Sequence, residues 1–154
     1  MSTMRRPEKA IRDRREMERI LGEAEVGRLG TCADGEPYVV PLSFAYHDGK
    51  IFFHCAKQGK KLDHIARNPR VCFEVDSGEV IRKEKPCNFS VRYESVIAYG
   101  DARICAEPTE MLRVLRLLTD KYAPGGMSGQ LTLEDLSKYR NLSLIHISEP
   151  TRPY

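Results

Sequence analysis

The sequence predicts a mainly β (α+β) protein in which a small antiparallel barrel carries peripheral helices. Its β-rich segments are separated by tight turns at Asp34-Gly35 and His47-Asp48-Gly49, and such short connections join antiparallel strands. The chain has no regular strand–helix alternation and no glycine-rich dinucleotide-binding signature, which disfavours a parallel α/β sheet. Closure into a barrel removes the exposed edges of such strands.

Local signals define the elements of the first half. Apolar residues recur at helical spacing over 7–24, and Pro7 suits a first helical turn, so a helix is predicted there. A short helix over 59–66 is ended by Asn68-Pro69, because a residue that precedes proline avoids helical geometry. Strands are predicted where β-branched and aromatic residues gather, at 26–32, 38–46, 51–56 and 71–75.

The pattern is less regular in the second half. Residues 76–86 are polar and are interpreted as a loop, and 89–105 as two strands or one long bent strand. A stripe of apolar residues predicts a helix over 108–122. A weaker helix is predicted over 132–139, with Thr132 as its cap.

Residues 1–141 are predicted to form a single domain, and residues 142–154 a doubtful tail. Positions 142–147 alternate like a strand, which would let them close the sheet. The same run looks like translated sequencing-adaptor DNA, and the proline-containing end that follows matches no structural element. We therefore expect the tail to be non-native and base the fold on residues 1–141.

Composition excludes several kinds of partner. The chain has 154 residues, 25 basic and 22 acidic, and its basic residues are not interleaved with aromatics, so nucleic acid is not expected as a partner. No apolar run could span a bilayer and the first residues lack a secretory signal, so we expect no membrane association and a cytoplasmic location. The five cysteines contain no Cys-x-x-Cys pair, which predicts neither a metal site nor a disulfide framework.

The segment Gly59-Lys60-Lys61 is the strongest candidate for a binding site. It follows a predicted strand and opens a predicted helix. Glycine permits close approach of a ligand, a helix N-terminus offers unpaired amides, and the lysines add positive charge, which together suit a phosphate. The alternative is that both lysines are simply solvated. The surrounding segments decide between a phosphate site and solvated lysines.

Four segments occur in order around this site: 37–44, 48–56, 59–63 and 68–73, which read PYVVPLSF, DGKIFFHCA, GKKLD and NPRVCF. They resemble the FMN-binding split-barrel proteins related to pyridoxamine 5'-phosphate oxidase, and most of all the Nim group of 5-nitroimidazole resistance reductases. The same pattern is matched by Met4-Arg5-Arg6, Tyr93-Glu94-Ser95-Val96 and Gly100. The resemblance covers most of the chain.

The resemblance implies a six-stranded antiparallel split β-barrel of Greek-key type, a homodimer, and FMN at the dimer interface. It implies an FMN-dependent, nitroreductase-like oxidoreductase whose substrate is a small molecule, a nitroimidazole-like or other acceptor. Carried over by position, Lys61 contacts the flavin phosphate beside Lys60, and His54 lies near the reactive edge of the flavin as the catalytic residue. The implied cofactor-binding set is Val40, Pro41, Leu42, Ser43, His54, Cys55, Gly59, Lys60 and Lys61.

Two other functions stay open. The chain could be a flavoprotein that acts on a pyridoxine-type amine, although it lacks the arginine-rich phosphate motif of true pyridoxamine-phosphate oxidases. It could also be a non-enzymatic split-barrel module that binds flavin or haem. His54 has a second interpretation as a core histidine that ends a buried strand, His47 is expected at the surface, and His64 could face solvent from the short helix.

Overall fold

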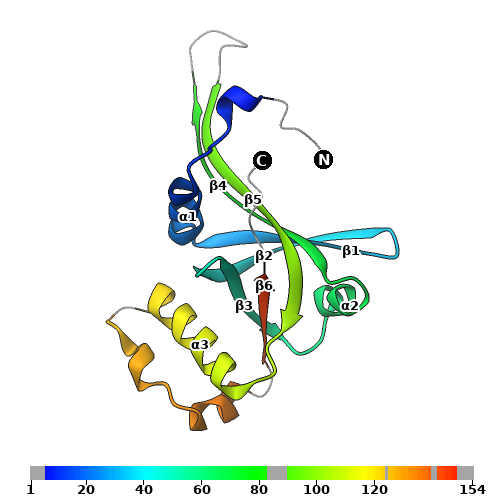
Figure 1. The fold of residues 1–154 in the computed structure, drawn as a ribbon, viewed down its shortest axis with the longest axis vertical. Coiled ribbons are helices and arrows are strands. Elements are labelled where there is room, and N and C mark those ends of the chain that lie inside the picture. Colours follow the sequence, from blue (N-terminus) through cyan, green and yellow to red (C-terminus); the bar gives the residue numbers. More distant parts are fainter. Residues whose placement is uncertain (1–5, 83–89, 124, 140–141, 149–154) are drawn as a thin grey trace.

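The computed structural model describes residues 6–82, 90–123, 125–139 and 142–148, and Figure 1 shows its ribbon. Its helices are α1 (Arg14–Glu23), α2 (Lys60–Arg67) and α3 (Pro108–Tyr122). Its strands are β1 (Val26–Ala33), β2 (Glu36–His47), β3 (Lys50–Ala56), β4 (Arg70–Ile81), β5 (Ser90–Ile104) and β6 (Leu142–Ser148). Three short 3-10 segments accompany them: η1 (Pro7–Lys9), η2 (Met127–Gln130) and η3 (Glu134–Tyr139), the last where the sequence predicts a weak helix.

The strands pair antiparallel in the order β1-β2-β3-β6-β5-β4, which closes on itself. The neighbouring order β4-β1-β2-β3 is that of a Greek key, with α2 in the connection from β3 to β4. The predicted mainly β antiparallel class with peripheral helices is confirmed. Because the sixth strand lies in the tail that the sequence predicts to be non-native, a native six-stranded barrel and a domain boundary at residue 141 stay predictions.

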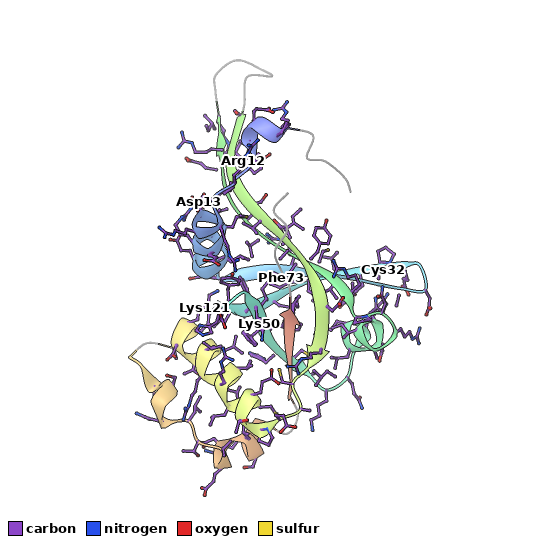
Figure 2. The ribbon with its side chains drawn as sticks, viewed as in Figure 1. Arg12, Asp13, Cys32, Lys50, Phe73 and Lys121 are labelled. Atoms are coloured by element: carbon purple, nitrogen blue, oxygen red, sulfur yellow. The ribbon has the colours of Figure 1, made fainter. Side chains whose placement is uncertain are left out.

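The barrel core is built around two phenylalanine rings. Phe44 of β2 and Phe73 of β4 meet edge to face with their ring centroids 4.8 Å apart. Phe73, labelled in Figure 2, also lies against the backbone of Gly27, where a Cβ would come within 2.2 Å of the ring. Glycine at position 27 is therefore a packing requirement of the core.

Two helices contribute to the same core from opposite sides of the barrel (Figure 1). Ile20 and Leu21 reach it from α1, and Leu62 and Ile65 reach it from α2. Both helices are amphipathic, and their polar faces remain in solvent. Among the helices of the described ranges, none is both long and apolar enough to cross a bilayer.

The first helix begins later than predicted. The prediction places it over 7–24, but only a 3-10 turn forms at Pro7–Lys9, and α1 starts at Arg14. Asp13 sets this start because its carboxylate accepts a hydrogen bond from the Arg15 amide at 2.9 Å and caps the helix.

The interpretation of residues 76–86 as a loop is wrong for 76–81. β4 continues to Ile81 and pairs residue by residue with β5, which is one long strand rather than two. Its polar sequence is compatible with a strand because this two-stranded arm extends away from the barrel (Figure 1), so that it meets solvent instead of a core. Residues 83–86 of the predicted loop lie outside the described residues.

α3 is anchored on the outside of the barrel by its last turn. Lys121 (Figure 2) donates from Nζ to the carbonyl oxygen of Ala24 and lies 3.9 Å from the Phe44 ring centroid. The hydroxyl of Tyr122 accepts a hydrogen bond from the Phe44 amide at 2.8 Å and lies 2.7 Å from the Phe44 carbonyl oxygen. Burial lowers the pKa of Lys121 from its ordinary 10.5 to about 8, although the charge of Glu25 acts in the opposite direction.

The lowered pKa of Lys121 makes its contribution to stability depend on pH. Between pH 8 and 10.5 the folded chain has released the Lys121 proton while the unfolded chain still holds it, so the free energy of unfolding rises with pH. We expect the difference in unfolding free energy between wild type and Lys121→Met to move in favour of wild type across this window. Urea titrations at stepped pH measure it, and the same substitution at exposed Lys57 is the control. A flat difference for Lys121→Met would contradict the shift.

Candidate functional site

The N-terminus of α2 is the centre of the predicted phosphate site. Gly59 starts the helix with φ +137° and ψ 161°, a conformation that only glycine adopts without strain. Its carbonyl accepts hydrogen bonds from the amides of Leu62 and Asp63 at 2.9 and 3.2 Å. The amides of Lys60 and Lys61 come before these and have no acceptor within the helix. A Cβ built on Gly59 would have no atom within 4 Å apart from those of its chain neighbours. A ligand can therefore approach this turn closely.

The two lysines of the turn have different environments. Lys60 places its ammonium 2.5 Å from the Glu36 carboxylate and 5.4 Å from the ring centroid of Tyr38. The hydrogen bond and charge of Lys60 lower the pKa of Glu36. Lys61 is half-buried and forms no ion pair with any residue that the structure describes. Of the two ammonium groups, that of Lys61 is the one available to an anion.

His54 and Cys55 face opposite sides of β3, as neighbours on a strand do. Cys55 is buried in the barrel core, where burial raises the pKa of its thiol while the charge of Lys61 acts in the opposite direction. A cofactor contact by Cys55 is therefore limited to its backbone. His54 is exposed, so its interpretation as a buried core histidine is wrong.

β2 and β3 separate beside His54. Phe44 pairs with Phe53, and beyond this pair β2 continues along β1 while β3 continues along β6. Ser43 and His54 are the next residues on the two strands, and both are exposed. The split thus brings the end of the predicted ring-binding segment and the predicted catalytic residue to one surface, just before the chain enters α2.

The predicted flavin-ring segment, 40–43, alternates between two faces of β2. Val40 and Leu42 pack against the barrel core, whereas Pro41 and Ser43 are exposed. A ligand on the outside of the barrel would therefore meet the backbone of this segment and the side chains of Pro41 and Ser43.

Sequence reasoning missed Thr31, Glu36 and Tyr38, which come from the β1–β2 hairpin and lie against α2. Thr31 Oγ1 is 3.1 Å from His64 Nδ1, and the Tyr38 ring packs edge-on against the His64 ring. His64 is only 5% exposed, so the prediction that it could face solvent is wrong. The one available signal is its position a helical turn after Lys60, which puts both residues on one face.

Two grooves of the described chain lie on the β4–β5 arm. They have volumes of about 390 and 270 Å³, and neither is lined by a residue of α2. In the chain as described, no three His, Cys, Asp or Glu side chains are placed to hold a metal ion. His47 is exposed at the β2–β3 turn, as predicted. Gly59 and Lys60 of the α2 turn are exposed, and Lys61 is half-buried.

The outer face of β2, β1, β4 and β5 carries exposed apolar side chains, and we call it the outer sheet face. Consecutive strand pairs place Val39, Gly30, Cys72 and Tyr99 in one row across it. Val39 is 65% exposed, and Tyr93, farther out on the arm, is 61% exposed. Between this row and Tyr93 the same face carries the ion pairs of Arg28 with Glu74 and Asp76, so the outer sheet face combines exposed apolar and charged groups.

A family model for pyridoxamine 5'-phosphate oxidase matches residues 13–150. The chain belongs to this family. The resemblance of the ordered segments around Gly59-Lys60-Lys61 is thereby confirmed at the family level.

Individual proteins that the chain resembles are identical to it at about a quarter of the matched residues. The Rhizobium meliloti (strain 1021) protein RA0666 is 27% identical over 88 residues, and this match spans 57% of the chain and only 58% of RA0666. A Bacteroides thetaiotaomicron VPI-5482 protein provisionally assigned to 5-nitroimidazole antibiotic resistance is 24% identical, with a TM-score of 0.77 over 92% of this chain and 82% of that one. An FAD-binding protein from Mesorhizobium loti is 26% identical, with a TM-score of 0.60 over 92% and 91%. The pyridoxamine 5'-phosphate oxidase fold is thus shared over most of the chain.

Proposed function

We propose that this chain is an FMN-dependent oxidoreductase that reduces nitroimidazole-like or other small acceptors. The observation that carries the proposal is the α2 turn, where a ligand can approach Gly59 closely and the Lys61 ammonium is not paired with a described carboxylate. The chain that carries this turn belongs to the pyridoxamine 5'-phosphate oxidase family. The FAD-binding protein of Mesorhizobium loti supports a flavin, and the Bacteroides protein assigned to nitroimidazole resistance supports the class of acceptor.

The residues of the α2 turn fit a phosphate monoester. Its free amides and the positive end of the helix dipole favour an anion, and Lys61 adds a full charge that no described carboxylate neutralises. Lys60 is already paired with Glu36, so a phosphate would have to compete with that carboxylate for it. Lys61 is therefore the principal phosphate ligand, and Lys60 a secondary one.

When bound, the flavin supplies the hydride or electron chemistry, and the protein supplies binding, orientation and protons. The 40–43 segment of β2 lies along the ring through its backbone, Pro41 and Ser43. His54 is exposed at the adjacent split and donates a proton to the acceptor, because a nitro group must take up protons as well as electrons. Imidazole is suited to this step because it exchanges protons near neutral pH.

The outer sheet face is the contact between two copies of the chain. Pro41 and Ser43 share the exposed face of β2 with Val39, so a second chain on the outer sheet face would cover a ring that lies along the 40–43 segment. The exposed apolar residues Val39, Val80, Val91 and Tyr93 support such a contact. The flavin would then lie at the edge of a homodimer, next to the split at Ser43 and His54.

Loss of the Lys61 ammonium should weaken FMN binding. We expect Lys61→Ala to lose about 1 to 3 kcal/mol of binding free energy, the scale of a charge-assisted hydrogen bond. Lys60→Ala should lose less, because Lys60 is already paired, and Lys50→Ala at the β2–β3 turn should lose nothing. Quenching of flavin fluorescence measures all three, with FMN and FAD titrated in parallel.

The wild-type result decides the cofactor. An absorbance spectrum before and after FMN addition separates a flavoprotein from a haem protein. A flat FMN titration of folded wild-type protein would overturn the proposed function, and equal losses from Lys61→Ala and Lys50→Ala would remove the special role of Lys61.

A charge on the outer sheet face should separate the two copies. We expect light scattering to give twice the 17.6 kDa chain mass for wild type and a single-chain mass for Val39→Glu, which buries a carboxylate in the contact. Leu133→Glu is the matched control, because Leu133 is also half-exposed but lies after α3 and away from this face. Single-chain wild type with flavin bound would contradict the dimer.

Removal of His54 should slow acceptor reduction without releasing FMN. We expect His54→Ala to lower the rate about a hundredfold, the lower range for general-acid catalysis. Stopped-flow oxidation of the chemically reduced flavin by a nitroimidazole measures the rate, and His47→Ala in the exposed turn is the control. An unchanged rate with FMN bound would leave His54 without a catalytic role. No reoxidation by nitroimidazole in wild type would instead favour the amine-oxidising alternative.

A further inference from the structure

α2 is too short to hold its position by itself. It has eight residues, and isolated helices of this length are marginal in water because nucleation outweighs the few hydrogen bonds gained. Its placement must come from the contacts of its buried face. Leu62 and Ile65 insert into the barrel core, but apolar contacts alone are non-directional and tolerate sliding and rotation.

The third buried residue of α2 adds a directional contact. His64 Nδ1 lies 3.1 Å from Thr31 Oγ1, and these are the two buried polar residues of the described chain, at 5% and 4% exposure. Among the described residues, no buried side-chain nitrogen or oxygen lacks a hydrogen-bond partner. The pair therefore favours one rotation and one position of α2 along β1. A slide of the helix would take the buried His64 Nδ1 away from Thr31, whose hydroxyl would keep its 3.5 Å hydrogen bond to the Tyr38 carbonyl.

The same face continues to the ligand end of the helix. The His64 ring packs edge-on against the Tyr38 ring, with centroids 6.0 Å apart. The ammonium of Lys60 lies over the same Tyr38 ring, 5.4 Å from its centroid. Glu36, two residues before Tyr38, holds Lys60 through its carboxylate. Thr31, Tyr38 and Glu36 of the β1–β2 hairpin thus contact α2 from His64 to Lys60.

The opposite end of α2 is fixed separately. The Asn68 amide donates to the His64 carbonyl at 2.7 Å, and the Asn68 side chain donates to the Cys32 carbonyl at 2.8 Å. Arg67 pairs with Asp34 at 2.8 Å. These bonds set where the helix ends, whereas the Thr31–His64 pair lies nearer the turn that carries Lys61.

We propose that His64, through Thr31, is the positioning residue for the anion-binding turn of α2. The proposal rests on the proposed function, because the ligand it concerns is the flavin phosphate. The pair preorganises the turn, so that binding does not have to order the helix at the same time. Thr31 and His64 do not touch the ligand themselves.

The test compares substitutions in the pair with one that changes the core elsewhere. Thr31→Val keeps the shape of the side chain and removes the hydroxyl, and Thr31→Ser restores it. Val114→Ala is the control, because Val114 is a fully buried residue of α3 in a separate cluster, and its truncation loosens the fold without touching α2. Thr31→Val also removes the 3.5 Å hydrogen bond from the Thr31 hydroxyl to the Tyr38 carbonyl, so His64→Leu, which breaks the pair from the helix side and leaves that bond in place, is measured beside it.

Two measurements are made on each folded variant: hydrogen exchange of the α2 amides without ligand, and FMN affinity by fluorescence quenching. We expect Thr31→Val to speed exchange in α2 and weaken FMN about tenfold, the scale of one lost buried hydrogen bond. Thr31→Ser should restore both, and Val114→Ala should change FMN affinity less than about twofold.

The outcomes separate the two proposals. Unchanged exchange in Thr31→Val, unchanged FMN affinity despite faster exchange, or an equal loss of affinity in Val114→Ala would each overturn the positioning role alone. Failure of wild type to bind FMN would overturn the proposed function and the positioning role with it.

Discussion

The fold depends on one close approach inside the barrel, the Phe73 ring against the backbone of Gly27. No side chain fits between them, since even a Cβ would lie 2.2 Å from the ring. The same ring meets Phe44 edge to face, so β4, β1 and β2 share a single contact. α1 and α2 then pack their apolar faces against this centre from opposite sides, which makes their positions a consequence of it.

This arrangement explains why the candidate site lies where it does. β2 pairs with β1 along its first part and with β3 only from Phe44 onwards, so the two strands separate at that residue. α2 packs against the core in the connection that follows, because Leu62 and Ile65 supply apolar area there. The turn that could bind phosphate is therefore the start of a helix that the core requires for its own packing.

The sequence predictions that are correct rest on local patterns. The helix predicted over 108–122 coincides with α3, because its apolar stripe and proline start are local signals. The arm at 76–81 was missed because a two-stranded ribbon in solvent needs no apolar alternation. The start of α1 was misplaced because the cap at Asp13 decided it over the earlier proline.

In the candidate site, too, the features with a local sequence pattern could be predicted and those that depend on distant residues could not. The Gly59-Lys60-Lys61 turn is contiguous and could be predicted, as could the opposite facing of His54 and Cys55 on β3. The difference between the two lysines could not, since it comes from Glu36 on another strand. Long-range partners of this kind have no local pattern, and only the fold brings them together.

The accessible and the buried residues of α2 differ in what their substitution would affect. Lys61 makes no described ion pair, so its replacement should affect a ligand much more than the fold. His64 and Leu62 are buried, so changes there act on both. A ligand that binds only the native turn also stabilises the native barrel by mass action, because the turn exists only while the helix is packed. Ligand binding at the turn and packing of the buried face would therefore be thermodynamically linked through a helix of eight residues, so that a ligand would partly offset a substitution that weakens the packing.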